Sequence, residues 1–125
     1  MSVPILKQGP YLIAAVQSAA SDAELTELRN DVVERVGRDR ARGVIVDVTL
    51  LEVMDSIAIR TLRDAALMAR LRGAETVIVG IRPEVAFAMV QLGLSLGPVS
   101  TALDLEDGLA HLDLKLGGRH AQVQR

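Results

Sequence analysis

The chain has 125 residues, a length that suits one domain with a sizeable hydrophobic core. It contains no cysteine, which excludes disulfides, thiolate catalysis and cysteine-based zinc sites. A formal charge of −2 and an aromatic share of 2% offer neither a basic surface nor a stacking ladder for nucleic acid. No apolar run approaches the roughly 18 residues of a membrane span, and no signal peptide pattern occurs. We therefore expect a cytoplasmic protein without nucleic acid or membrane partners.

The N-terminal half predicts a hairpin, a helix and a buried strand. Gly9-Pro10 is a turn between the short apolar stretches VPILKQ and YLIAAV, which suit two paired strands. Ser21 and Glu24 have the spacing of a capping box and predict a helix that ends within residues 38–42. Residues 44–48 are β-branched and nearly all apolar, as in a central strand that is buried on both faces. The helix is expected to bury residues at helical spacing, namely Leu25, Leu28, Val32 and Val36.

After Ser56, helical and strand patterns alternate. A helix is predicted from there to the Arg72-Gly73 pair, and a strand over residues 76–80 follows it. A further helix is expected from Pro83 to Gly93, then a short strand over 99–103 and a last helix over 104–116. The expected buried faces of the three helices are Ala58, Ile59, Leu62, Ala65, Ala66 and Ala69; Val85, Met89 and Leu92; and Leu105, Leu109, Leu112 and Leu116.

The order of these elements predicts the fold class. Strands that alternate with helices indicate an α/β fold with a mostly parallel sheet, and the hairpin supplies an antiparallel N-terminal edge. We expect one domain over residues 1–116. Residues 117–125 are polar and begin with glycine, and we expect a flexible tail there.

Most kinds of active site are disfavoured by the residues that they require. His111 and His120 have no carboxylate cluster at ligand spacing, so both are expected on the surface and no metal is predicted. Ser56 lies in MDSIA and not in the G-x-S-x-G turn of a serine hydrolase. No glycine occurs between residues 44 and 72, so neither a phosphate-binding loop nor a cofactor is predicted at this turn.

A phosphoaccepting receiver domain is a further alternative of the same size, with Asp47 or Asp55 as the acceptor. Such a domain needs a pair of acids after the first strand to hold magnesium, and a lysine late in the chain. Gln17-Ser18-Ala19-Ala20 follows the predicted strand that begins at Tyr11, and the last predicted strand has no lysine. This alternative is therefore disfavoured.

Asp55 and Ser56 stand together where the central strand gives way to a helix, and two interpretations of them remain open. One residue of the pair is an N-cap, worth about 1 kcal/mol to the helix. Alternatively, Ser56 is an exposed hydroxyl that a kinase modifies, because a helix N-terminus tolerates the added charge of about −1.5 to −2. By proximity, Met54, Ile57 and Arg60 are candidates for an exposed contact surface around it.

The chain resembles the STAS family, and within it the small single-domain stressosome antagonists, over residues 3–116. The stretches that carry this resemblance are VPILK, YLIAAVQ, GVIVDVT, VMDSIA, GAETVIVGIRPEVA, LGL and TALDLEDGLAHL. The resemblance implies a sheet of four or five strands, about four helices and a role without catalysis. It implies that Ser56 is the phosphorylation site, and we expect Asp55 and Asp47 to support the switch loop.

The resemblance also implies partners. A longer STAS paralogue with an N-terminal sensory domain would join this chain in a large shell that holds a serine/threonine switch kinase. Phosphorylation of Ser56 would free the kinase, and a phosphatase that acts on phosphoserine would reset the site. Because the sequence begins at its first strand, we expect the short member of this pair, and we expect self-association.

Two alternatives stay open at this point. A free anti-anti-sigma factor would bind an anti-sigma kinase directly and build no shell. A small-ligand-binding module is more remote, although α/β folds place such sites at the carboxyl ends of strands, where Asp55 is expected.

Overall fold

The N-terminal hairpin forms around the Gly9-Pro10 turn, as predicted, and begins a five-stranded sheet. The structure is a computed structural model that describes residues 3–97 and 99–117. The first two strands pair antiparallel and all other neighbours pair parallel, which confirms the predicted α/β class with its antiparallel edge. In both chain order and sheet order the strands are β1 (Ile5–Gln8), β2 (Tyr11–Ala15), β3 (Gly43–Asp47), β4 (Glu75–Val79) and β5 (Ser100–Ala102).

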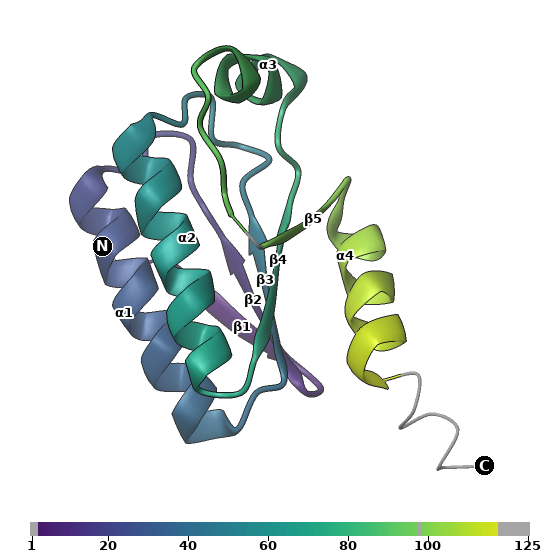
Figure 1. The fold of residues 1–125 in the computed structure, drawn as a ribbon. Coiled ribbons are helices and arrows are strands. Elements are labelled where there is room, and N and C mark those ends of the chain that lie inside the picture. Colours follow the sequence, from purple (N-terminus) through teal and green to yellow (C-terminus); the bar gives the residue numbers. More distant parts are fainter. Residues whose placement is uncertain (1–2, 98, 118–125) are drawn as a thin grey trace.

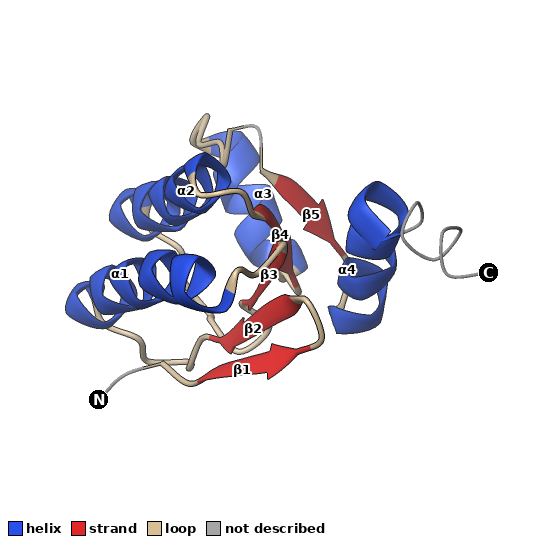
Figure 2. Ribbon diagram, turned by 90° about the horizontal axis from the view of Figure 1, so that it is seen from below, coloured by secondary structure: helices blue, strands red, loops and turns tan. Residues whose placement is uncertain are grey.

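Helices cover both faces of this sheet. In the described residues they are α1 (Asp22–Asp39), α2 (Ser56–Leu71), α3 (Pro83–Gln91) and α4 (Leu105–Leu112), which continues as a π-helical turn, η1 (Asp113–Gly117). Figure 1 shows α1 and α2 side by side on one face of the sheet and α4 on the other, with α3 standing beyond the end of the strands. Figure 2 shows the same three layers from below.

The capping box predicted at the start of α1 is present. The backbone N–H of Glu24 donates to Ser21 Oγ at 3.1 Å, and the N–H of Ser21 donates to Glu24 Oε1 at 3.0 Å. These two hydrogen bonds with Ser21 hold the pKa of Glu24 below its usual value. The helix ends at Asp39 because Arg40 adopts a left-handed conformation, with φ of 52°. The predicted face is buried, with Leu25, Leu28, Val32 and Val36 each at most 2% exposed.

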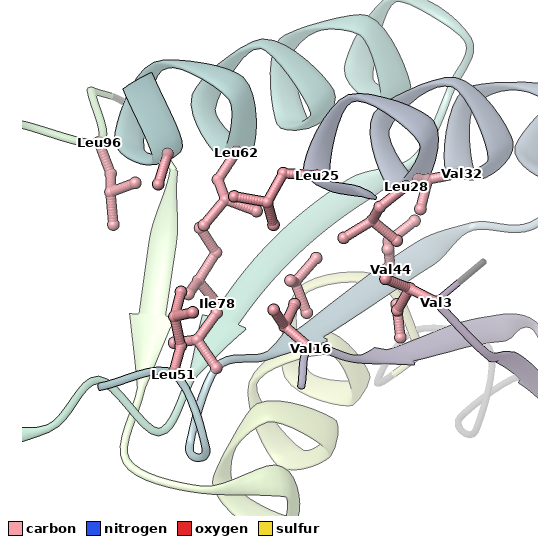
Figure 3. Packing of buried hydrophobic residues seen from close by; sticks show 14 of the residues in the cluster. Val3, Val16, Leu25, Leu28, Val32, Val44, Leu51, Leu62, Ile78 and Leu96 are labelled. Atoms are coloured by element: carbon pink, nitrogen blue, oxygen red, sulfur yellow. The ribbon is translucent and has the colours of Figure 1, made fainter. Parts of the chain in front are cut away.

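The core lies in two layers because successive side chains of β3 point to opposite faces. Val44 and Val46 join the larger cluster under α1 and α2, which Figure 3 shows from close by. Ile45 joins a smaller cluster with Leu112 under α4. All three residues are at most 2% exposed, which confirms that the central strand is buried on both faces. Gly108 lets α4 approach closely, because a Cβ there would lie 2.7 Å from Val79 Cγ1.

The structure corrects three details of the predicted elements. Leu92 is 72% exposed because it follows the last residue of α3 and turns away from the core. The regular α-helix of the last segment ends at Leu112, and a wider π-helical turn continues it to Gly117. His111 was expected on the surface, but it is half-buried, and its Nε2 is buried without a hydrogen-bond partner among the described residues. His120 and residues 118–125 of the expected tail lie outside the described part.

Two further properties bear on function. Within residues 3–97 and 99–117, no helix combines the length and apolar character that a membrane crossing requires. The same residues contain no group of three or more histidine, aspartate or glutamate side chains placed to hold a metal ion.

Candidate functional site

Asp55, and not Ser56, caps the helix that begins here. The backbone of Asp55 is extended, with φ of −81° and ψ of 179°, and its Oδ1 accepts a hydrogen bond from the N–H of Ala58 at 2.8 Å. Its carbonyl oxygen accepts the first helical hydrogen bond, from the N–H of Ile59 at 3.0 Å. Ser56 is the first residue of α2 and its side chain is exposed. The capping bond therefore leaves the Ser56 hydroxyl open to solvent.

The loop that leads to this cap, residues 48–55, is fixed from within. The N–H of Val48 donates to the carbonyl oxygen of Val79 at 2.9 Å and so extends the pairing of β3 with β4. Leu51 and Met54 are 4% and 7% exposed, and both belong to the larger core cluster. The expectation that Met54 lies on the exposed surface is therefore wrong. Its side chain turns inward and anchors the loop, a direction that proximity to Ser56 in sequence does not determine.

Asp47 organises the beginning of the same loop. Its Oδ1 accepts hydrogen bonds from the backbone N–H of Thr49 at 2.9 Å and from the Thr49 hydroxyl at 2.5 Å. This double contact closes a tight turn at the carboxyl end of β3. The carboxylate is therefore engaged with the loop itself.

A second segment, between β4 and α3, holds the turn from outside. The Nε of Arg82 donates a hydrogen bond to the carbonyl oxygen of Thr49 at 2.9 Å. Gly80 has φ of +81°, and a Cβ built on it would overlap Thr49 Oγ1 and lie 3.1 Å from Thr49 Cα. Only glycine combines this backbone conformation with so close an approach. The loop before Ser56 is thus held by Asp47, at the end of β3, and by Gly80 and Arg82, which follow β4.

The loop before Ser56 and the first turn of α2 expose apolar side chains. Leu50, Val53 and Ile57 are 51%, 74% and 50% exposed, although large apolar side chains are usually covered. Arg60 is also exposed and lies one helical turn after Ser56, where residues four apart are neighbours on a helix. Of the three predicted contact residues, the structure therefore places Ile57 and Arg60 on the surface. We call Leu50, Val53, Ser56, Ile57 and Arg60 the switch surface.

Thr49, Gly80 and Arg82 were missed by reasoning from the sequence. A usable signal existed for Gly80, since a glycine directly after a buried strand often marks a special backbone conformation. Arg82 and Thr49 are 33 positions apart, and no local pattern connects them. Their contact follows from the parallel pairing of β3 and β4, which brings the ends of the two strands together.

The sheet order, the four helices and the capped α2 define a small α/β domain of a known class. The sequence profile of the STAS domain matches residues 4–107, and the chain therefore belongs to the STAS family. The resemblance seen in the sequence is confirmed. Over 98 residues the chain is 31% identical to the RsbT co-antagonist protein RsbRA of Bacillus subtilis (strain 168), covering 78% of this chain and 34% of that protein. It is 29% identical over 85 residues to RsbRD of the same organism, covering 68% and 31%. The chain thus spans about a third of the length of these relatives.

Solved structures agree in fold along nearly the whole chain. A serine-to-glutamate variant of RsbS from Moorella thermoacetica has a TM-score of 0.78 and 31% identity, with 90% of this chain and 96% of that chain covered. A chain from a structure of the stressosome, described as a signal integration and transduction hub, has a TM-score of 0.76 and 31% identity, with 90% and 97% covered. The unphosphorylated anti-sigma factor antagonist SpoIIAA has a TM-score of 0.65 at 10% identity, with 88% and 96% covered, and shares the fold.

Proposed function

We propose that this chain is a scaffold and antagonist that holds a serine/threonine switch kinase in a stressosome-like assembly and releases it when Ser56 is phosphorylated. In this role the chain supplies a regulated surface and no catalytic group. The observation that carries the proposal is the division of roles at the start of α2. Asp55 makes the capping hydrogen bond, and the neighbouring Ser56 hydroxyl is exposed on a partly apolar surface.

A phosphoryl group on Ser56 is compatible with the fold. The first turn of a helix stabilises negative charge, because its backbone N–H groups carry partial positive charge. The loop before Ser56 is anchored by Leu51, Met54 and the clamp at Thr49, none of which uses the Ser56 hydroxyl. Phosphorylation is therefore expected to leave the domain folded.

The same phosphoryl group changes what the switch surface can bind. It adds about −1.5 to −2 charge beside the Asp55 carboxylate and between exposed apolar side chains. A partner that buries Val53 and Ile57 would have to strip water from this new anion, which opposes binding. Phosphorylation is thus expected to act on the contact surface and not on the fold.

The names of the relatives support the partners in this proposal. RsbRA and RsbRD are co-antagonists of RsbT, and two similar chains come from RsbS and from a stressosome. We propose that this chain associates with itself and with a longer STAS paralogue that carries an N-terminal sensory domain. A phosphatase that acts on phosphoserine resets Ser56, and the assembly works in the cytoplasm.

The first experiment tests the site. The purified chain is incubated with ATP and a serine/threonine switch kinase of the stressosome type, and the intact mass and modified peptide are measured. We expect one phosphate on Ser56 and none on Ser56→Ala. Ser95→Ala is the control, because Ser95 is also exposed but lies in the loop after α3. Stoichiometric phosphate on Ser56→Ala would contradict the site.

The second experiment tests the assembly. Light scattering of the chain with the longer paralogue and the kinase is expected to show one large particle that loses the kinase after phosphorylation. A complex of only one antagonist and one kinase would instead identify a free anti-anti-sigma factor. Ile57→Asp is expected to weaken kinase binding, whereas Leu71→Asp, at the far end of the same helix, is expected to leave it unchanged.

A further inference from the structure

Arg60 is the one cation of the switch surface, and its guanidinium is not engaged elsewhere. Two other arginines of this region donate hydrogen bonds to main-chain carbonyl oxygens. Arg63 Nη1 donates to Ser95 at 3.4 Å, and Arg82 Nε donates to Thr49 at 2.9 Å. Arg60 is exposed, and within the part of the chain that the structure describes it forms no ion pair. Its charge is therefore available to a new anion.

Arg60 is also placed to reach back toward Ser56. Both residues lie in α2, and both are exposed. Residues four apart on an α-helix are neighbours, with about 5–6 Å between their Cβ atoms. Every Cα–Cβ bond of an α-helix tilts toward the N-terminus, so a long side chain covers the turn that precedes it. An anion on the Ser56 side chain would therefore lie within reach of the guanidinium of Arg60.

Asp64, four residues further along α2, is the acid that competes for Arg60. An acid and a base four residues apart attract each other more strongly when the acid comes first in the chain. A phosphorylated Ser56 followed by Arg60 has this favoured order, whereas Arg60 followed by Asp64 has the weaker one. In the described residues Arg60 and Asp64 form no ion pair. A phosphoryl group also carries about −1.5 to −2 charge, which exceeds that of a carboxylate.

We propose that Arg60 pairs with the phosphoryl group of phosphorylated Ser56. The pairing rests on the proposed function and names the residue through which the modified site is read. Phosphorylation then has two effects on the switch surface: it adds an anion, and it withdraws the one cation of this surface from a partner. Arg60 is a positioning residue for the phosphoryl group, because its planar guanidinium matches the oxygens of a phosphate. The change that a partner meets is therefore larger than the charge of the phosphate alone.

The test uses chains that receive phosphoserine at position 56 during synthesis, so no kinase is required. Phosphorus NMR follows the second ionisation of the phosphate, which has a pKa of about 6. A neighbouring cation favours the dianion and lowers this pKa, so loss of Arg60 should raise it. We expect the phosphate in Arg60→Gln to titrate about 0.2–0.4 pH units above the wild type, as for an exposed pair. The difference should shrink in about 1 M salt, which screens exposed charges.

Two further variants serve as controls. Arg63→Gln removes the same charge from the same helix, but Arg63 lies seven residues after Ser56 and contacts Ser95. We expect it to raise the pKa of the phosphate by less than half as much as Arg60→Gln does. Arg60→Lys keeps a cation at the site and is expected to titrate close to the wild type. The acidic residues near position 56 are the same in every variant, and circular dichroism confirms that each is folded.

Three outcomes would overturn the pairing. In the first, Arg60→Gln titrates at the wild-type midpoint. In the second, Arg63→Gln raises the midpoint as much as Arg60→Gln does, which would indicate a general effect of charge. In the third, Arg60→Lys raises it as much as Arg60→Gln does, so that the charge at this position is not the cause. The pairing and the switch fail separately, because a kinase that leaves Ser56 unmodified contradicts the switch alone.

Discussion

Arg82 donates a hydrogen bond from its Nε to the carbonyl oxygen of Thr49, 2.9 Å away. This bond joins the segment that starts α3 to the loop that ends at the cap of α2. It connects the two segments that follow β3 and β4. The loop before Ser56 therefore owes its position partly to a residue that is distant in sequence.

Replacing Arg82 by Gln is expected to loosen this loop. A side-chain hydrogen bond to a backbone carbonyl contributes about 1 kcal/mol, so a loss of that order in unfolding free energy is expected. Amide hydrogen exchange of residues 49–55 should accelerate more than that of β3. Arg60→Gln serves as the control, because Arg60 is exposed on α2. Equal exchange rates in the two variants would show that the Arg82 bond does not hold the loop.

Replacing Gly80 by Ala is expected to be more harmful. The left-handed backbone there costs an L-residue about 1–2 kcal/mol, and the new methyl group would overlap the Thr49 side chain, for a total loss of about 2–4 kcal/mol. Chemical denaturation measures this loss.

Gly73→Ala separates the two contributions to that loss. Gly73 has φ of +96°, but nothing lies within 4 Å of a Cβ built on it. Its replacement should therefore cost only the backbone term, about 1–2 kcal/mol. If both variants lose the same stability, the close approach to Thr49 is not the reason for the glycine at position 80.

The division of roles between Asp55 and Ser56 predicts unequal effects of alanine. Asp55→Ala removes the capping bond to Ala58 and is expected to lower the unfolding free energy by about 1 kcal/mol. Ser56→Ala removes an exposed hydroxyl and is expected to stay within about 0.5 kcal/mol. Urea denaturation of both variants decides the point, and an equal loss would return Ser56 to the role of a cap.

Tyr11 predicts a loss of stability at high pH. Its hydroxyl donates to Asp113 Oδ1 at 2.6 Å. Burial, followed by the hydrogen bond and negative charge of Asp113, raises the pKa of Tyr11 to about 12. In the unfolded chain this pKa is about 10, so the folded state keeps a proton that the unfolded state has lost. The stabilising contribution is complete below about pH 10 and disappears as the pH rises towards 12.

The sequence makes this titration simple to follow. Tyr11 is the one tyrosine and the chain has no tryptophan, so the absorbance of phenolate reports this residue alone. We expect a midpoint near pH 12 in the folded protein and about two units lower in urea. In Tyr11→Phe, the decline of stability over this pH range should become shallower. A midpoint near pH 10 in the folded state would show that neither the burial of Tyr11 nor its contact with Asp113 raises this pKa.

Local patterns predicted the elements of the fold because each element follows simple periodic rules. The apolar spacing in α1 and α2 identified their buried faces, and the β-branched run identified β3. The prediction that Leu92 is buried was wrong, because the apolar spacing continues past Gln91, the residue at which α3 ends. The π-helical turn after Leu112 has no comparable sequence signal.

The candidate site was predicted less completely because much of it is nonlocal. The strand-to-helix junction at Asp55-Ser56 could be found from the sequence, and capping chemistry limited its roles. The inward direction of the Met54 side chain could not be predicted from the sequence. Side chains in a loop follow no fixed period, and the burial of Met54 depends on the larger core cluster beneath the loop. The contact between Thr49 and Arg82 arises only when β3 and β4 are paired.

The capping of α2 by Asp55 has a practical consequence for observing the protein. The chain contains no cysteine, so Ser56→Cys would introduce its one thiol at an exposed position that the capping bond does not use. A fluorophore or spin label attached there would report directly on how crowded and how mobile that position becomes as assemblies form and dissolve. Because the natural sequence has no other thiol, the signal of the label would report on contacts at this one position in real time.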